Sequence, residues 1–388
     1  MVYLHVPFCR SFCTYCGFYS EICREGHDSQ IFNEYADSVI KEVQRRKDEI
    51  ADIPLKTIYI GGGTPSVLPL EVLDRVVNAV REAQNHASLE EFTIEVNPED
   101  IFEHGEDYVM GLLDLGVTRI SMGVQSFDDG ILHWMNRRHD SATAKEAFNI
   151  IRTASENAGK DVSLSIDLIF GIPGLETHIW QDTLREALKL GRDNGFRWPD
   201  HISAYQLSVE EVSALERMIG EGKCEEISEE ICSHQYDMLC EMLSHAGFNH
   251  YEVSNFAVSG HEAVHNSAYW ERIPYVGIGP GAHSFSIHTE GTLCRQFRSW
   301  NTQTLPTKGA CWSRGYEELS DEDIRTEKIM LAMRTSKGID ETELRTLCGG
   351  RKVECLISSG SLVRYGSGMV RIPEDRFFVS DEIIRELV

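Results

Sequence analysis

The chain of 388 residues carries 37 Lys and Arg against 62 Asp and Glu, which gives a formal net charge of −25. This charge repels phosphate backbones and anionic membranes, so no nucleic acid partner is expected, and membrane contact is expected only through a partner protein. The start of the sequence lacks a basic segment followed by a long apolar run, and the eleven cysteines are an odd number. Together these features predict a soluble cytoplasmic protein with reduced thiols.

Six short runs of β-branched and aromatic residues alternate with amphipathic helical patterns in the first part of the chain. This alternation is typical of repeated βα units, and six units predict an α/β fold with a partial (β/α)6 TIM-like barrel. Because ligands bind at the carboxyl ends of parallel strands, we expect functional residues directly after the strands. The predicted strands span residues 3–6, 57–60, 92–96, 119–124, 163–170 and 201–207.

Two further units are predicted after a barrel at residues 1–247. Residues 248–318 are rich in Gly, His and aromatic residues without a clear period, and they predict an irregular connecting segment. Residues 319–388 combine helical patterns with a hairpin predicted in SGSLVRYGSGMVRIP, an arrangement that resembles a winged helix. Residues 351–388 hold six basic and six acidic side chains, so we expect a packing or lid module rather than a DNA reader.

The first predicted strand is followed by CRSFCTYCGF, in which Cys9, Cys13 and Cys16 form a C-x3-C-x2-C pattern. Free cysteines are often small buried hydrophobic residues, but three thiols on one short loop indicate a metal site. Structural zinc usually takes four ligands in paired C-x2-C spacings, and only the more distant Cys23 could complete such a set. A four-iron cluster held by three thiolates would instead leave one iron open to a further ligand.

Several motifs carry a resemblance to a known family. The C-x3-C-x2-C pattern after a first strand is similar to the hallmark of the radical S-adenosylmethionine (SAM) superfamily. More closely, YLHVPFC, GGGTP, IEVNPE, GVQSF, NRRH, SIDLIFGIPG and GIGPGAHSF resemble the group of oxygen-independent coproporphyrinogen III oxidases and HemW-type haem chaperones. The resemblance implies that Cys9, Cys13 and Cys16 hold a [4Fe-4S] cluster whose open iron binds SAM. It also implies that residues 319–388 form a HemN-type helical domain.

The resemblance further implies a SAM pocket built from residues near the strand ends. Glycines let a backbone approach a ligand closely, which suits the GGGTP segment to the methionine end of SAM. Asp167 lies within the apolar SLSIDLIFG, where a buried carboxylate requires a donor. Without the resemblance, Glu95 could equally be an exposed strand residue, and Arg137 could be a surface arginine with no role in binding. The implied SAM set is Tyr3, Tyr15, Gly62, Gly63, Thr64, Glu95, Gln125, Arg137, Asp167 and Ser208.

Two features separate the functions that the resemblance implies. Phe18 stands where the oxidases typically have a further cysteine. HNSAYW, residues 265–270, matches the H-N-x-x-Y-W signature of the chaperone group, so His265 would ligate haem iron while Tyr269 and Trp270 contact the porphyrin. Only two residues precede Tyr3, so an N-terminal extension that contacts substrate in the oxidases is expected to be missing.

We therefore favour a haem chaperone that binds haem and a SAM-ligated [4Fe-4S] cluster, with haem-acceptor proteins and an electron donor as partners. The alternative is a coproporphyrinogen III dehydrogenase, which converts propionates to vinyl groups. From spacing alone, HNSAYW could also be a turn packed by its own aromatic rings, and an unrelated radical enzyme stays open because cofactor motifs do not specify a substrate. A second haem ligand could come from His250, His261 or His283, and the spacing does not select one of them. Cys294 and Cys311 also have no assigned role.

Overall fold

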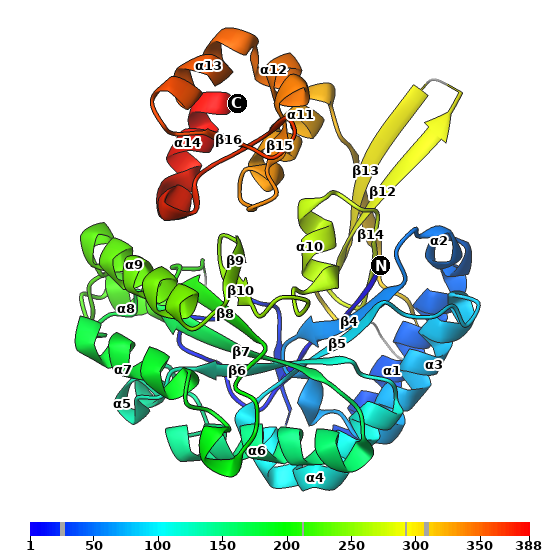
Figure 1. The fold of residues 1–388 in the computed structure, drawn as a ribbon. Helices are drawn as coiled ribbons and strands as arrows, with labels where there is room; N and C mark the ends of the chain where they lie inside the picture. The colour runs from blue at the N-terminus through cyan, green and yellow to red at the C-terminus, as the bar shows by residue number, and fades with distance from the viewer. Residues whose placement is uncertain (24–27, 212, 292, 306–309) are drawn as a thin grey trace.

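A curved nine-stranded sheet forms the body of the protein in a computed structural model (Figure 1), which describes residues 1–23, 28–211, 213–291, 293–305 and 310–388. The strand order is β11-β1-β4-β5-β6-β7-β8-β10-β9. The six central strands are parallel and overlap the six predicted ranges, so the predicted α/β fold with a partial barrel is confirmed. They are β1 (Val2–Val6), β4 (Thr57–Gly62), β5 (Glu91–Val96), β6 (Arg119–Gln125), β7 (Ser163–Phe170) and β8 (His201–Gln206).

Side chains alternate along these strands between the helical layer and the barrel interior. Ile166 and Leu168 are fully buried, whereas Asp167 between them is only half-buried and lines an interior cavity. In β5, Ile94 is fully buried and the neighbouring Glu95 lines the same cavity. Since successive strand residues point to opposite faces, these polar residues are directed into the barrel by the same pattern that buries their apolar neighbours.

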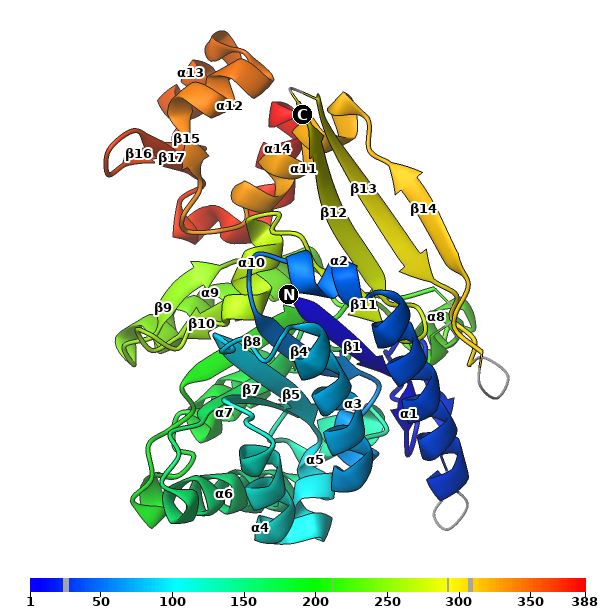
Figure 2. The same cartoon turned by 90° about the vertical axis from the view of Figure 1, so that its right-hand side faces the viewer.

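Helices cover the outer face of the curved sheet (Figures 1 and 2). Residues 31–50 carry one continuous amphipathic pattern in the sequence, and the structure divides it after Arg45 into α1 and α2. The helices of the barrel are α1 (Asp28–Arg45), α2 (Lys47–Asp52), α3 (Leu70–Ala83), α4 (Pro98–Asp114), α5 (Asp129–Trp134), α6 (Ser141–Ala158), α7 (Thr177–Ala187), α8 (Ala214–Gly220) and α9 (Glu229–His245).

The segment that was expected to be irregular is regular, so that prediction is wrong. β9 (Asn249–Glu252) and β10 (Asn255–Ala257) form a hairpin that extends the sheet beyond β8. After α10 (Val264–Trp270), β11 (Val276–Ile278) pairs in parallel with β1 at the other edge. Strands of three or four residues are too short to show an alternating pattern, which is why the sequence did not indicate them.

A three-stranded antiparallel ribbon and a helical module complete the structure (Figure 2). The ribbon consists of β12 (His283–Glu290), β13 (Leu293–Asn301) and β14 (Arg314–Glu318). The module contains α11 (Asp321–Ala332), β15 (Ile339–Asp340), α12 (Glu341–Cys348), α13 (Gly350–Ser358), β16 (Val363–Tyr365), β17 (Met369–Arg371) and α14 (Ser380–Leu387). β16 and β17 pair as the predicted hairpin. Within the described ranges, the helices are too short or too polar to cross a membrane.

Candidate functional site

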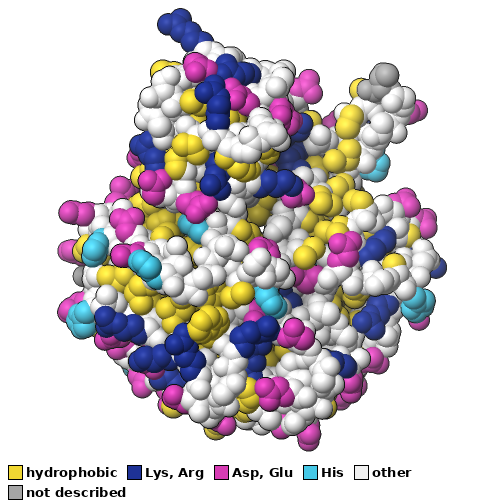
Figure 3. All heavy atoms as spheres, viewed as in Figure 1, with side chains coloured by type: hydrophobic (Ala, Val, Ile, Leu, Met, Phe, Trp, Pro, Cys, Tyr) yellow, Lys and Arg dark blue, Asp and Glu magenta, His cyan; other side chains and the backbone are white. Residues whose placement is uncertain are grey.

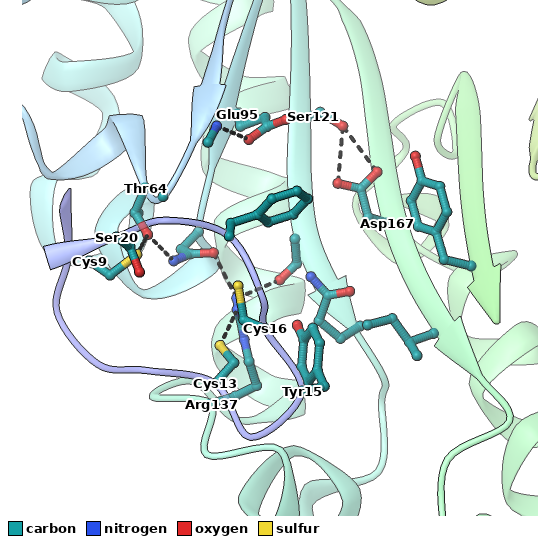
Figure 4. A pocket seen from close by; sticks show the side chains of 18 of the residues that line it. Cys9, Cys13, Tyr15, Cys16, Ser20, Thr64, Glu95, Ser121, Arg137 and Asp167 are labelled. Atoms are coloured by element: carbon teal, nitrogen blue, oxygen red, sulfur yellow. Dashed lines mark hydrogen bonds between the residues drawn. The ribbon is translucent and has the colours of Figure 1, made fainter. Parts of the chain in front are cut away.

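A cavity of about 530 Å³ opens where the parallel strands end and continues into the barrel interior. Its wall combines the loop after β1 with residues on and after β4, β5, β6, β7 and β8, as Figure 4 shows for the central part. We call it the cofactor cavity. The predicted residues that line it are Cys9, Cys13, Tyr15, Cys16, Gly62, Gly63, Thr64, Glu95, Gln125, Arg137, Asp167 and Ser208.

Backbone pairings fix the cysteine loop against the end of the barrel. β2 (Phe8–Cys9) pairs in parallel with β3 (Glu21–Ile22), which closes the base of the loop. In the middle of the loop, the Thr14 N–H donates to the carbonyl oxygen of Met135 at 3.1 Å and the Thr14 hydroxyl donates to that of Trp134 at 2.8 Å. Both acceptors lie at the end of α5, so the barrel itself sets the shape of the loop that carries the three thiols.

The three thiols line the cofactor cavity beside polar side chains that include Ser20, Thr64 and Arg137 (Figure 4). Burial raises the pKa of Cys9 and raises that of Cys16 to about 11, so these thiols stay protonated at neutral pH until a metal displaces the proton. Among the described residues, no three His, Cys, Asp or Glu side chains converge on a single ion. Thiolates of an iron–sulfur cubane bind separate irons and need not converge on one point.

Arg137 connects the cysteine loop to the sheet. Its guanidinium donates to the Cys13 sulfur at 3.4 Å, to Asn97 Oδ1 at 2.7 Å and to the Gly123 carbonyl oxygen at 2.8 Å (Figure 4). Although burial disfavours its charge, Tyr15 and Cys13 hold the pKa of Arg137 above the usual value. The Arg137 Nε atom is buried without a partner. A permanent cation with a spare donor in the cavity wall suits an anionic ligand such as a carboxylate.

The GGGTP segment brings backbone, rather than side chains, against the cysteine loop. The N–H of Gly63 donates to the Val6 carbonyl oxygen at 2.7 Å, and that of Thr64 donates to the Phe8 carbonyl oxygen at 2.7 Å. A Cβ atom at Gly63 would lie 2.7 Å from that Phe8 oxygen and 3.0 Å from Cys9 Sγ. Only glycine fits at this position without a shift of the backbone or of the thiol.

We expect Gly63→Ala to destabilise the fold by about 1–3 kcal/mol, because overpacking here meets backbone atoms that cannot move aside. Urea unfolding followed by circular dichroism measures the change. Gly220→Ala is the matched control, since Gly220 has no heavy atom within 4 Å of an added Cβ. Equal stability of the two variants would contradict the expected close packing of Gly63.

Two carboxylates face the cavity from within the barrel. Glu95 accepts from the Gly62 N–H at 3.0 Å and from the Tyr59 hydroxyl at 2.7 Å. Asp167 accepts from the Ser121 hydroxyl at 3.0 and 3.2 Å. Burial raises the pKa of Glu95 to about 7 and also raises that of Asp167. The open alternative of an exposed surface Glu95 is thereby excluded, and both groups are available to bind polar groups of a ligand.

Three predicted residues lie at the margins of this arrangement. Tyr3 does not line the cavity; it is the second residue of β1, and its hydroxyl is hydrogen-bonded to His5 Nδ1 at 3.0 Å. Gln125 does line it and has a left-handed backbone with a φ of 67° at the end of β6. Ser208 is exposed at the rim, where its hydroxyl donates to Glu210 at 2.6 Å.

The structure places HNSAYW at the other end of the barrel from the cysteines, on α10. The backbone N–H groups of Val264 and His265 each donate to Glu91, the first residue of β5, at 2.9 Å. His265 is fully buried, with Nδ1 bonded to the hydroxyl of Thr57, the first residue of β4, at 2.7 Å and Nε2 bonded to the Tyr269 hydroxyl at 2.9 Å. α10 therefore closes the amino end of the barrel.

The other residues of α10 face different surroundings. Asn266 lines the cofactor cavity, whereas Tyr269, three residues further along the helix, lines a second cavity. Trp270 ends the helix, is half-buried and lines neither cavity. The histidines considered as second haem ligands, His250, His261 and His283, also lie outside both cavities.

The barrel, the three-cysteine loop and the glycine segment together define a radical SAM protein, and a model of the Radical SAM superfamily matches residues 3–187. The haem chaperone HemW of Synechocystis is 32% identical over 91% of this chain and 82% of its own length. HemW of Bacillus subtilis is 30% identical over 87% of this chain and 84% of its own length. The chain therefore belongs to the HemW family within the radical SAM superfamily.

A solved structure supports the fold independently. Coproporphyrinogen III oxidase (HemN) from Escherichia coli superimposes with a TM-score of 0.75 over 100% of this chain and 89% of the oxidase, at 21% sequence identity. This likeness extends to the C-terminal module. At such an identity it bears on the fold alone.

The residues present fit the cofactors that are typical of the superfamily, a [4Fe-4S] cluster and SAM. The donor set consists of three thiols on one cavity wall. The buried Thr93 Oγ1 and Arg137 Nε atoms also face this region and lack partners within the protein. Buried polar atoms are costly unless a partner satisfies them, so these two atoms favour a polar ligand in the cavity.

Proposed function

We propose that this protein is a haem chaperone, which binds haem and a SAM-ligated [4Fe-4S] cluster and delivers haem to acceptor proteins. The observation that carries the proposal is the 32% identity, over 91% of the chain, to the Synechocystis protein named haem chaperone HemW. Haem-acceptor proteins and an electron donor are the partners that this role requires.

On this proposal, Cys9, Cys13 and Cys16 hold the cluster as thiolates. When bound in this way, the cluster supplies one iron with an open coordination position for the amino and carboxylate groups of SAM. Arg137 keeps the Cys13 thiolate in place and offers its Nε to a carboxylate. The Gly62–Thr64 backbone and Glu95 line the part of the cavity next to the cluster loop, where they would contact the methionine end of SAM.

The affinity for SAM is expected to rise about tenfold between about pH 6 and pH 8, because an ionised carboxylate is the stronger acceptor. Glu95, with a pKa of about 7, is largely protonated at the lower end of this range and ionised at the upper end. Isothermal titration of the anaerobically reconstituted protein measures the affinity. In Glu95→Gln the dependence should be nearly flat, and an unchanged pH slope in this variant would exclude Glu95 as its source.

The proposed haem-binding element is α10, with His265, Tyr269 and Trp270. Both ring nitrogens of His265 are hydrogen-bonded, so direct coordination of iron by this residue requires one of these bonds to break. Burial lowers the pKa of His265 to about 3, which keeps the imidazole neutral. A neutral imidazole is the form that binds a metal.

Coproporphyrinogen III dehydrogenase is the alternative activity. Phe18, at the position of a further cysteine in the oxidases, is 72% exposed and lies at the cofactor cavity. An aromatic ring at this position cannot act as a thiolate ligand or thiol donor. This residue therefore supports the chaperone proposal over the dehydrogenase.

The proposal is tested by reconstituting the cluster anaerobically and offering haem in one reaction and coproporphyrinogen III with SAM and a reductant in another. We expect a stable haem complex by absorption spectroscopy and no release of carbon dioxide. Formation of protoporphyrinogen with carbon dioxide would overturn the chaperone function. Unchanged haem binding in His265→Ala would remove His265 from the haem site while leaving the function intact.

A further inference from the structure

A second cavity, of about 420 Å³, lies between α10, the β12–β13 ribbon and α11. It is within the size range of small-molecule sites. Figure 3 shows the surface hollowed between the C-terminal module and the ribbon, with hydrophobic side chains along both sides. The residues used below are Tyr269, Arg272, Tyr275, Phe285, Arg298 and Met330, all of which line this cavity. We call it the ribbon cavity.

The walls of the ribbon cavity combine aromatic rings with aliphatic and thioether groups. The rings of Tyr269 and Tyr275 lie 4.7 Å apart in an edge-to-face arrangement, and Phe285 on β12 faces the same space. Met330 contributes its side chain from α11. Such surfaces suit a large planar apolar ligand, because aromatic faces and edges pack closely against another ring system.

Two guanidinium groups lie on one side of the cavity. Arg272 lies over the Phe285 ring, with 4.9 Å between its guanidinium carbon and the ring centroid, and it also donates to Gln296 at 2.6 Å. Arg272 and Arg298 both form ion pairs with Glu327, and Arg298 is also 3.3 Å from the more exposed Glu317. The charges balance, because the two arginines pair with Glu327 and with the exposed Glu317, and carboxylates of a ligand would pair with the guanidinium groups in place of these partners.

We propose that the ribbon cavity is the haem site, where the porphyrin packs against Tyr269, Tyr275 and Phe285 and its propionates pair with Arg272 and Arg298. The inference rests on the proposed haem-chaperone function and adds a location and a set of partners to it. Arg272 and Arg298 lie outside HNSAYW, so the motif alone does not indicate them. Glu327 competes with the propionates for the same guanidinium groups.

The ribbon cavity also gives the HNSAYW helix a structural role. Asn266 of α10 lines the cofactor cavity and Tyr269 lines the ribbon cavity, so one short helix contributes to both sites. The hydrogen bond from His265 fixes the Tyr269 ring in the wall of the ribbon cavity. His265 is then a positioning residue for the porphyrin platform.

The test measures haem affinity by absorption titration of the full chain, with haem and with haem dimethyl ester, in which both propionates are blocked. Wild-type protein is expected to prefer haem, and Arg272→Gln/Arg298→Gln should weaken haem binding about tenfold to hundredfold while leaving the ester nearly unaffected. Glu327→Gln is expected to tighten haem binding, because it removes the competing carboxylate. Arg295→Gln, on the same strand but paired with the exposed Glu318 at 3.6 Å, is the matched control.

The outcomes separate the location from the function. A variant that fails to fold would bind neither haem nor haem dimethyl ester. The proposal instead requires that the double arginine variant lose affinity for haem alone and that Glu327→Gln gain affinity for haem. If the double variant binds haem as tightly as the wild type, the assignment of the ribbon cavity as the haem site is wrong, whereas the chaperone function stands. If the wild-type protein binds neither ligand, the chaperone function is overturned and the cavity assignment falls with it.

Discussion

Cys13→Ala is expected to abolish binding of the iron–sulfur cluster, with iron content after anaerobic reconstitution falling from about four per chain to near zero. The loop offers three thiols to the cofactor cavity, and removal of one leaves two ligands for a four-iron cluster. The substitution also removes the sulfur that accepts from Arg137 at 3.4 Å. Iron and sulfide analysis together with electron paramagnetic resonance of the reduced protein measures the loss, and SAM affinity should fall with it.

Cys23→Ala is the matched control for this loss. Cys23 is buried, its thiol contacts the Cys9 carbonyl oxygen at 3.4 Å, and it does not line the cofactor cavity. It is the residue that could complete a four-thiol set according to the sequence, so the cluster content of this variant decides between the two ligand sets. Retention of the cluster is expected. Its loss would assign Cys23 as a fourth ligand and leave no open iron for SAM.

Most of the residues named from the sequence line one cavity because they belong to short local segments. The thiols come from a single loop, and Gly62, Gly63 and Thr64 follow one strand directly. In a parallel sheet, all such segments meet at one edge, so the order of strands along the chain was sufficient to bring them together. The same rule failed for Tyr3, which is the second residue of β1 and lies toward the amino end of its strand.

Residues that depend on strand register were not predicted. Ser121 on β6 lies opposite Glu95 on the neighbouring strand β5. On its other side, the Ser121 hydroxyl donates to Asp167 on β7. Tyr59, which donates to Glu95, occupies the neighbouring strand. The order of the strands along the chain does not show how far one strand is shifted along its neighbour. This register decides which side chains of neighbouring strands meet.

The proposed haem site was the hardest to infer from the sequence. HNSAYW is local and could be found as a motif, but the partners of His265 come from the starts of β4 and β5 and from within α10. The ribbon cavity brings together α10, β12, β13 and α11, which are joined only by the folded structure. No spacing in the chain indicates that Arg272 and Arg298 share Glu327.

His265→Ala is expected to lower the free energy of unfolding of the cofactor-free protein by about 2–4 kcal/mol at neutral pH. The substitution leaves the Thr57 and Tyr269 hydroxyls without their partner in a fully buried position and creates a cavity beneath α10. His265→Gln keeps most of the volume and one possible hydrogen bond, so it should recover part of the loss. Urea unfolding followed by circular dichroism measures the three proteins side by side.

The pH dependence gives a second readout that a general loss of packing would not produce. Burial holds the pKa of His265 at about 3 in the folded protein, against an ordinary value of 6.5 in the unfolded chain. The unfolded chain therefore binds an additional proton below about pH 6.5, and the stability that His265 contributes is complete above this pH and decreases as the pH falls toward 3. The stability advantage of the wild type over His265→Gln should shrink by about 1.4 kcal/mol for each pH unit below 6.5. If the difference in the free energy of unfolding between the wild type and His265→Gln stays constant from pH 7 to about pH 5, His265 is not buried as a neutral imidazole. That result would also contradict the closure of the barrel by α10.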